Sequence, residues 1–282
     1  MSGHDPAALR ETAAELARAA GAVLLEGYGR AHTPERKGRI DLVTEYDRRS
    51  ERVLLDAIAR RTPGAAVLAE ESGAHAGAPA GAGATGALRW ILDPLDGTTN
   101  FAHNYPFFAV SIAAELDGEL AAGAVFDPVR DDLFAAARGH GATLNGAPIR
   151  VSNVAQIEDA LLVTGFPYDV REHPERSLPQ FQAFLMRAQG VRRDGSAALN
   201  LCYLAAGRFD GFWEASLSPW DVAAGALLIR EAGGVLTDYE GGPFALDTKR
   251  ILATNGRLHE EMRAILAGAA AGERAAGPAP RR

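Results

Sequence analysis

Apolar residues recur every three or four positions over residues 6–26, which is the period of an amphipathic helix. Asp5 stands directly before this pattern, where a helix N-cap is expected, and a proline fits the first turn. A second helical pattern follows Thr44-x-x-Asp47, the spacing of a capping box, and stops at a Thr-Pro-Gly sequence. The chain is therefore predicted to begin with two helices.

Short apolar runs after these helices predict buried strands. Residues 65–71 and 88–93 contain two such runs, both ending in acidic residues and separated by an Ala/Gly-rich loop. From residue 110 to residue 150, apolar runs alternate with Asp-Gly, Asp-Pro and Asn-Gly pairs, which predicts an antiparallel meander. Strand-like and helix-like segments alternate in the rest of the chain, as they do in α/β proteins.

This change of pattern along the chain predicts two lobes and a tail. Residues 1–150 are expected to form an α+β lobe and residues 151–268 an α/β lobe, with the boundary between residues 146 and 158. Residues 269–282 are rich in Ala, Gly, Pro and Arg, so we expect them to be a disordered tail.

The composition of the 282 residues, 47% hydrophobic and 23% charged, is that of a soluble globular protein. No run approaches the ~18 apolar residues that cross a bilayer, and the amino terminus lacks a signal pattern, so a cytoplasmic location is expected. The single cysteine, Cys202, cannot form an intramolecular disulfide. A net charge of −7 disfavours sequence-independent binding to nucleic acid, although Arg192 and Arg193 leave a local basic patch open.

The sequence WILDPLDGTTNF, residues 90–101, carries the most distinctive chemistry. Asp93 and Asp96 end one predicted strand, and Glu70 and Glu71 end the preceding one. If the two strands lie side by side, three or four carboxylates converge, and hard divalent cations, above all Mg²⁺, are their natural partners. An isolated D-x-x-D-G is more often a simple turn, so the residues that follow decide between the two interpretations.

Gly97, Thr98 and Thr99 continue this motif with the features of an anion-binding turn. Glycine lets a ligand approach the backbone, and the threonines offer hydroxyl and amide donors at the start of a helical turn. Cation-binding acids beside an anion-binding turn are what metal-assisted phosphate chemistry requires. The sequence lacks a Walker-type loop, and Asp93 and Asp96 do not form the D-x-D of an aspartyl nucleophile, so the attacking group is expected to be water.

Two segments together resemble the signatures of a known family. WILDPLDGTTNF and WDVAAGALLIREAGG (220–234) are similar to the two signature motifs of the inositol monophosphatase family of magnesium-dependent, lithium-sensitive phosphatases. Supporting matches are DLVTEYD (41–47), AEES (69–72) and GSAALNLCYLAAGRFDGFWE (195–214), and the resemblance extends over residues 5–268. It implies a layered αβαβα sugar-phosphatase fold with an α+β lobe and an α/β lobe, and it implies a homodimer.

The resemblance also implies a set of metal ligands, most of them in the first lobe. Glu70, Asp93 and the backbone carbonyl of Leu95 match the first metal site. Asp93, Asp96 and Asp221 match the second metal site, so Asp93 would be a ligand of both metals. Glu70 would also serve a third, weaker ion, so two to three Mg²⁺ ions per active site are expected. The two lobes must fold together to bring Asp221 to the other ligands.

Catalytic and substrate-binding residues are implied in the same way. Thr98 and Asp47 match the pair that orients the nucleophilic water, Glu70 is a further catalytic candidate, and Lys37 matches a mobile-loop lysine near the metals. Arg193 is an additional candidate for approaching the substrate. The implied substrate contacts are Asp96, Gly97, Thr98, Gly195, Ser196, Ala197, Glu214 and Asp221. Among them, Glu214 and Asp221 are assigned to sugar hydroxyls.

Several of these residues also have a purely structural interpretation. Thr44 and Asp47 fit a capping box, and Asp221 fits an acid placed at a helix start. Cys202 and the tryptophans fit core positions, and His103 and His140 lack metal-ligand spacing and fit structural positions.

The expected function is Mg²⁺-dependent hydrolysis of a phosphate monoester, with inositol-1-phosphate giving inositol and phosphate. Family branches that act on adenosine bisphosphate or histidinol phosphate resemble D-G-T-K rather than the D-G-T-T-N-F of this chain. Fructose-1,6-bisphosphatase or broad sugar-phosphatase activity stays open. A second class of function also stays open, because some bacterial relatives act as accessory factors that bind the transcription or RNA machinery.

Overall fold

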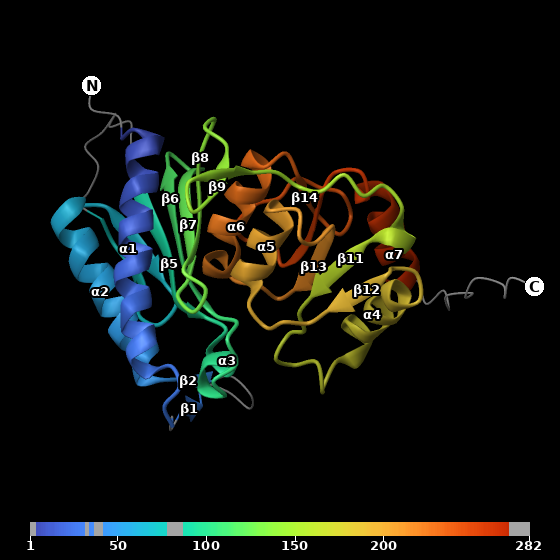
Figure 1. Cartoon of the computed structure of the whole chain (residues 1–282), viewed down its shortest axis with the longest axis horizontal. Coiled ribbons are helices and arrows are strands. Elements are labelled where there is room, and N and C mark those ends of the chain that lie inside the picture. Colours follow the sequence, from blue (N-terminus) through green and yellow to red (C-terminus); the bar gives the residue numbers. More distant parts are fainter. Residues whose placement is uncertain (1–3, 32–33, 37–41, 78–86, 271–282) are drawn as a thin grey trace, which may run out of the picture.

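The computed structural model of the protein describes residues 4–31, 34–36, 42–77 and 87–270. Its elements form five layers: two helices, a large sheet, two helices, a small sheet and two further helices (Figure 1). Three clusters of buried apolar side chains hold these layers together. The layered αβαβα fold predicted from the sequence is thereby confirmed.

The first layer consists of α1 (Pro6–Gly27) and α2 (Glu45–Arg61), which pack on each other and on the large sheet (Figure 1). The Asp5 carboxylate accepts a hydrogen bond from the first-turn amide of Ala7 at 3.1 Å, as an N-cap does. Thr44 and Asp47 form the predicted capping box at the start of α2. Both helix starts expected from the sequence are therefore confirmed.

The large sheet has eight strands in the order β10-β9-β8-β7-β6-β5-β3-β4. In chain order they are β3 (Ala66–Ala69), β4 (Gly73–His75), β5 (Leu88–Asp96), β6 (Ala109–Leu116), β7 (Glu119–Asp127), β8 (Asp132–Ala137), β9 (Ala142–Leu144) and β10 (Ala147–Ile149). The predicted meander is confirmed, because each strand from β5 to β10 pairs antiparallel with the next. Strands β3 and β5 pair in parallel, so the acids at their ends emerge at the same edge.

Strand β5 does not end at Asp93, as the sequence pattern predicted, but continues to Asp96. Both aspartates still pair with β6, while a β-bulge between them places two residues of β5 opposite one of β6. Pro94 has no N–H for the strand ladder, and a bulge is one of the few strand positions that tolerate a proline. The bulge lets one strand carry both Asp93 and Asp96.

The central layer consists of α5 (Ala197–Ala205) and α6 (Pro219–Glu231), which lie between the two sheets (Figure 1). Two glycines permit the close approach of these elements. A Cβ at Gly123 of β7 would lie 3.0 Å from the Cα of Ala224, and a Cβ at Gly225 of α6 would collide with Leu201 of α5. The buried Cys202 belongs to this layer and is a free thiol.

The small sheet has five strands in the order β12-β11-β13-β15-β14. These are β11 (Leu161–Thr164), β12 (Gly190–Arg192), β13 (Gly211–Ala215), β14 (Val235–Asp238) and β15 (Arg250–Thr254). The last helical layer consists of α4 (Leu178–Leu185) and α7 (His259–Ala270), which pack on each other beside this sheet (Figure 1). The short elements are β1 (Glu35–Arg36), β2 (Leu42–Val43), α3 (Thr98–Ala102) and the 3₁₀ turns Ile157–Asp159 and Pro174–Arg176.

The chain leaves the large sheet after Ile149 and enters the small sheet at Leu161. The division into two lobes at residue 150 stays a prediction. Helix α7 includes residues 269 and 270 of the predicted tail, and the rest of that tail lies outside the described residues. Within the described ranges, no helix combines the length and apolar character needed to span a membrane.

His259 makes the stability of the small-sheet half depend on pH. This residue is 6% exposed, and its ring nitrogens lie 3.0 Å from the hydroxyls of Thr254 and Thr237. Burial lowers the pKa of His259 below its ordinary 6.5, with a smaller opposing effect of Glu260 and a smaller reinforcing effect of Arg263. The folded state therefore favours the neutral ring, so its stabilising contribution is complete above about pH 6.5 and is lost as the pH falls below that value.

We predict that His259→Gln flattens this part of the pH dependence. Urea unfolding of both proteins at about pH 5.5 and about pH 7.5 measures the effect, because the difference between the two proteins cancels the other titrating groups. The wild type should lose more free energy of unfolding on acidification than the variant does. Equal losses in the two proteins would contradict the assignment to His259.

Candidate active site

The edge at which β3 and β5 end leads through Gly97 into α3. Gly97 has a φ of +94°, the left-handed conformation that side chains disfavour. A Cβ at this position would also lie 3.0 Å from the carbonyl oxygen of Phe107. The turn and the helix start predicted after Asp96 are both present, and this backbone path requires a glycine.

Asp47 and Thr98 are brought together from α2 and α3, although they stand far apart in the sequence. One oxygen of the fully buried Asp47 carboxylate, Oδ2, accepts the backbone amide of Thr44 at 2.8 Å and its hydroxyl at 2.6 Å. The other oxygen, Oδ1, lies 3.0 Å from the hydroxyl of Thr98. The structural and the functional interpretations of Asp47 are therefore compatible, because each uses a different oxygen.

Asp96 connects the end of β5 to the start of α5. Its carboxylate accepts hydrogen bonds from the hydroxyl of Ser196 and from the backbone amides of Ala198 at 2.8 Å and Ala197 at 3.3 Å. Burial raises the pKa of Asp96 from 3.8 to about 6, and these hydrogen bonds act in the opposite direction. The turn that was predicted to contact substrate, residues 195–197, is thus held against a predicted metal ligand.

Asp93 is the centre of a group of interacting carboxylates. It is 1% exposed, and its Oδ1 accepts the backbone amide of Leu95 at 3.0 Å. Burial raises the pKa of Asp93 well above 3.8, and the negative charges of Glu70, Asp96 and Asp221 raise it further. The convergence of acids that the sequence predicted for this edge is therefore present.

Asp221 reaches this group from the first turn of α6. It forms a capping box with Ser218, whose backbone amide donates to Asp221 Oδ2 at 2.7 Å. Burial raises the pKa of Asp221 well above 3.8, Asp96 contributes the next largest effect, and Lys249 opposes the shift. Like Asp47, Asp221 takes part in a capping box at a helix start and also belongs to the site.

Glu214, near the end of β13, extends the acidic site toward the small sheet. Burial raises the pKa of Glu214 to about 8, Asp221 and Asp96 raise it further, and Arg193 opposes them. The carboxylate packs against Gly165 so closely that a Cβ there would collide with it. The guanidinium of Arg193 lies 5.9 Å from the ring centre of Phe166. The structure thus places both predicted contacts, Glu214 and Arg193, beside the acids.

The chemistry of these donors fits a hard divalent cation. They are carboxylate oxygens in a buried, mutually repulsive group, next to the backbone carbonyl of Leu95. In the part of the chain that the structure describes, no three His, Cys, Asp or Glu side chains already form a group that could hold a metal ion. Asp96 accepts bonds from the start of α5 and Asp221 accepts one from Ser218, so a cation would use the lone pairs that these bonds leave available.

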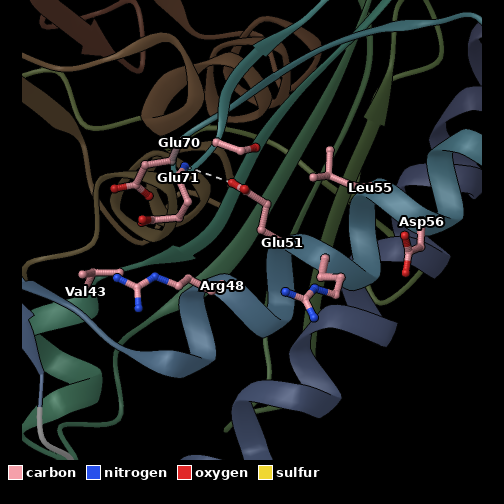
Figure 2. A pocket seen from close by; sticks show the side chains of 9 residues that line it. Val43, Arg48, Glu51, Leu55, Asp56, Glu70 and Glu71 are labelled. Carbon is pink, nitrogen blue, oxygen red and sulfur yellow. Dashed lines mark hydrogen bonds between the residues drawn. The ribbon is translucent and has the colours of Figure 1, made fainter.

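Glu70 lies beside a cavity of about 620 Å³ between α2 and the end of β3. Figure 2 shows Glu70, Glu71 and Arg48 around this cavity, with a hydrogen bond from Glu71 to Glu51 of α2. In that bond, the backbone amide of Glu71 donates to Glu51 Oε2 at 2.9 Å. The helix therefore fixes the segment that carries Glu70.

The sequence interpretation missed three side chains that position the site. Ser50 donates its hydroxyl to the carbonyl of Pro94 in the bulge at 2.8 Å, and Glu51 holds the amide of Glu71. Asn100 contacts the backbone of the turn before Gly195. These are long-range contacts, and only the match of Asn100 to a signature motif could have drawn attention to one of them.

Lys37, the lysine that was matched to a loop near the metals, lies outside the described residues.

The fold has five α/β layers. Its site is acidic, compatible with Mg²⁺ and located at a strand edge beside a helical turn. These features together define a class of protein. That class is the layered sugar phosphatases, hydrolases that act on phosphate esters with the help of divalent metal ions.

The model of the "Inositol monophosphatase family" matches residues 5–270, and the chain belongs to this family. The family is generally Mg²⁺-dependent and lithium-sensitive. An inositol-1-monophosphatase from Synechocystis sp. is 46% identical over 258 residues, covering 91% of this chain and 88% of the relative.

Two further relatives carry a different kind of name. The Nus factor SuhB from Salmonella typhimurium is 41% identical over 252 residues, covering 89% of this chain and 92% of the relative. The crystal structure of extragenic suppressor protein suhB from Bartonella henselae is 40% identical, with a TM-score of 0.84 and coverage of 92% and 98% of the two chains. The same fold therefore occurs under two descriptions of function.

We predict that Asp93→Asn stabilises the protein when divalent cations are removed. The amide keeps an acceptor for the Leu95 amide but removes one of the repelling buried charges, so the free energy of unfolding in EDTA should rise by at least about 1 kcal/mol. The same variant should gain less thermal stability than the wild type when Mg²⁺ is added. A variant that is less stable in EDTA and equally stabilised by Mg²⁺ would contradict this account.

Proposed function

We propose that the protein hydrolyses phosphate monoesters, with inositol-1-phosphate as the preferred substrate and Mg²⁺ as the cofactor. The observation that carries the proposal is the pairing of Thr98 with Asp47 directly beside the acid group around Asp93. Membership of the inositol monophosphatase family supports the same reaction. The arrangement combines a place for cations with a polar pair that can orient water.

Two to three ions would be held by residues from both halves of the fold. Glu70, Asp93 and the Leu95 carbonyl would hold one ion, Asp93, Asp96 and Asp221 a second, and Glu70 a weaker third. Bound Mg²⁺ supplies Lewis-acid stabilisation of phosphate charge and lowers the pKa of water. Because β5 carries three of these ligands across its bulge, the strand sets their relative positions.

Thr98 and Asp47 would handle the proton of the attacking water. The hydroxyl of Thr98 has one hydrogen and two oxygen acceptors within reach, Asp47 Oδ1 at 3.0 Å and the Leu95 carbonyl at 3.1 Å. When that hydrogen is donated to Asp47, the lone pairs of Thr98 Oγ1 can accept a hydrogen bond from water. Asp47 is fixed by Thr44, so it holds the hydroxyl in a constant direction.

The remaining contacts favour a polyol as the alcohol part of the ester. The amides of Gly97 and Thr98 would bind the phosphate, and Glu214 and Asp221 would accept hydrogen bonds from hydroxyls. Carboxylates are strong acceptors for hydroxyl donors, and two of them can bind neighbouring hydroxyls of a ring. The turn of residues 195–197 would contribute further polar groups, with Arg193 at its edge.

The choice of ester is tested with the wild-type protein and Mg²⁺ on inositol-1-phosphate, fructose-1,6-bisphosphate and p-nitrophenyl phosphate. We predict the highest kcat/KM for inositol-1-phosphate and loss of all three activities in EDTA. A preference of about tenfold or more for fructose-1,6-bisphosphate would replace the proposed substrate with the sugar-bisphosphate alternative. Undiminished turnover in EDTA would contradict the metal-dependent reaction itself.

We predict that Thr98→Val lowers kcat by roughly 10²-fold while KM changes by less than about threefold. Valine keeps the shape of the side chain and removes the hydroxyl that would orient water. Thr98→Ser, which keeps the hydroxyl, is the matched control and should retain most of the activity. If the valine variant raised KM and kept kcat, Thr98 would be a substrate-binding residue instead.

A second candidate function is supported by the similarity to the Nus factor SuhB of Salmonella typhimurium. The protein would then bind the transcription or RNA machinery through a surface, alone or in addition to catalysis. Pull-down from a bacterial lysate with wild-type and Asp96→Asn baits tests this function. Equal recovery of RNA polymerase by both baits, absent with an unrelated bait, would support it, and no recovery would exclude it.

A homodimer, as the family resemblance implies, is tested by sedimentation of the purified chain.

A further inference from the structure

We propose that Asn100 is a positioning residue that sets the polyol-binding turn, residues 194–197, against the phosphate-binding turn, residues 97–99. The inference rests on the proposed function, since it concerns which part of the substrate each turn contacts. Asn100 lies on α3, one turn after the Gly97 backbone bend, and is partly buried.

The side-chain amide of Asn100 joins two segments that are far apart in the sequence. Its Nδ2 donates to the carbonyl of Phe107 at 2.7 Å and to the carbonyl of Asp194 at 2.8 Å. The second bond spans 94 positions of the chain and reaches from the half of the molecule built on the large sheet to the other half. Both hydrogens of one amide group are used, so the distance between the two segments is fixed by a single planar group.

The glycines of the two turns are fitted to the same residue. Gly195 has a φ of +88°, and a Cβ there would lie 3.1 Å from Asn100 Nδ2 and 3.2 Å from its Oδ1. Gly97 approaches the Phe107 carbonyl that Asn100 also binds. Asn100 therefore lies between the two turns. It contacts the backbone of the turn of residues 194–197, and it binds the Phe107 carbonyl that Gly97 of the other turn approaches.

Asp96 also connects the two halves, but it serves a different purpose. Its carboxylate is a proposed metal ligand, so its bonds to Ser196 and Ala198 compete with a cation for the same oxygens. The bonds of Asn100 go only to backbone carbonyls, which leaves them in place whatever Asp96 binds. An uncharged donor is thus the group that can keep the polyol-binding turn in position throughout turnover.

The experiment compares Asn100→Leu and Asn100→Ala with the wild type on two esters. Leucine has nearly the shape of asparagine without the donors. Inositol-1-phosphate uses both turns, whereas p-nitrophenyl phosphate has no hydroxyls for the turn of residues 194–197. We expect the kcat/KM ratio of the first ester over the second to fall roughly tenfold or more in both variants, mainly through KM of the first. An unchanged ratio would overturn the proposal.

The matched control is Asn104→Gly, in the segment that follows α3. Asn104 bonds to the backbone of Gly29 and Arg30 and has a φ of +54°, so glycine removes its contacts without straining the chain. Its substrate ratio should equal that of the wild type. If this control changed the ratio as much as the Asn100 variants did, the effect would be a general loosening of α3, which also overturns the proposal.

Amide hydrogen exchange gives a readout that is independent of activity. Peptides covering residues 194–199 should exchange roughly five- to tenfold faster in Asn100→Leu than in the wild type, with no such change in Asn104→Gly. If the wild type did not hydrolyse inositol-1-phosphate, the proposed substrate would be wrong, but faster exchange would still support the positioning role. Unchanged exchange at these residues would remove that role whatever the substrate.

Discussion

The constraint on which the rest of the structure depends is the burial of several like charges at one edge between the two sheets. Asp93, Asp96 and Asp221 all have raised pKa values because burial disfavours their charged forms. The charges of Asp96 and Asp221 raise the pKa of Asp93 further, and the charge of Asp96 raises that of Asp221. A group of this kind destabilises a fold unless its oxygens find donors. The bulge of β5 and the starts of α5 and α6 supply such donors, to Asp93, Asp96 and Asp221 respectively.

Helix N-termini supply most of the compensation, because their amides carry partial positive charge without neutralising a carboxylate. Asp47 accepts bonds at the start of α2, Asp96 at the start of α5 and Asp221 at the start of α6. For Asp47 and Asp221, a role at a helix start and a role in the site were rival interpretations at the level of sequence, and for Asp96 the rival was a simple turn. Because a carboxylate has two oxygens and several lone pairs, one residue can satisfy both roles.

The sequence predicted most features that depend on local spacing and fewer that depend on long-range contacts. The capping box at Thr44 and the meander after residue 110 follow from periodicity and turn residues, and they are confirmed. The end of β5 was misplaced, because a proline inside a strand pattern looks like a strand end unless a bulge accommodates it. The roles of Ser50 and Asn100 could not be predicted, since their backbone partners are 44 and 94 positions away. Glu70, Asp93 and Asp96 were expected from their places at the ends of predicted strands. Asp221, Glu214 and the turn of residues 195–197 were found only through the motif resemblance.

The number of donors that each acid receives explains why the members of the group differ. Asp96 accepts from Ser196, Ala197 and Ala198, and its pKa rises only to about 6. Asp93 accepts from the Leu95 amide, and the repulsion of its neighbours adds to the effect of burial, so its pKa lies well above 3.8. Asp221 also accepts one amide, that of Ser218, and its pKa also lies well above 3.8. The protein therefore compensates the charges of Asp93 and Asp221 less than that of Asp96, and both are ligands of the proposed cation sites. A cation held by these carboxylates would offset their mutual repulsion, which ties the stability of this edge to the occupancy of the site.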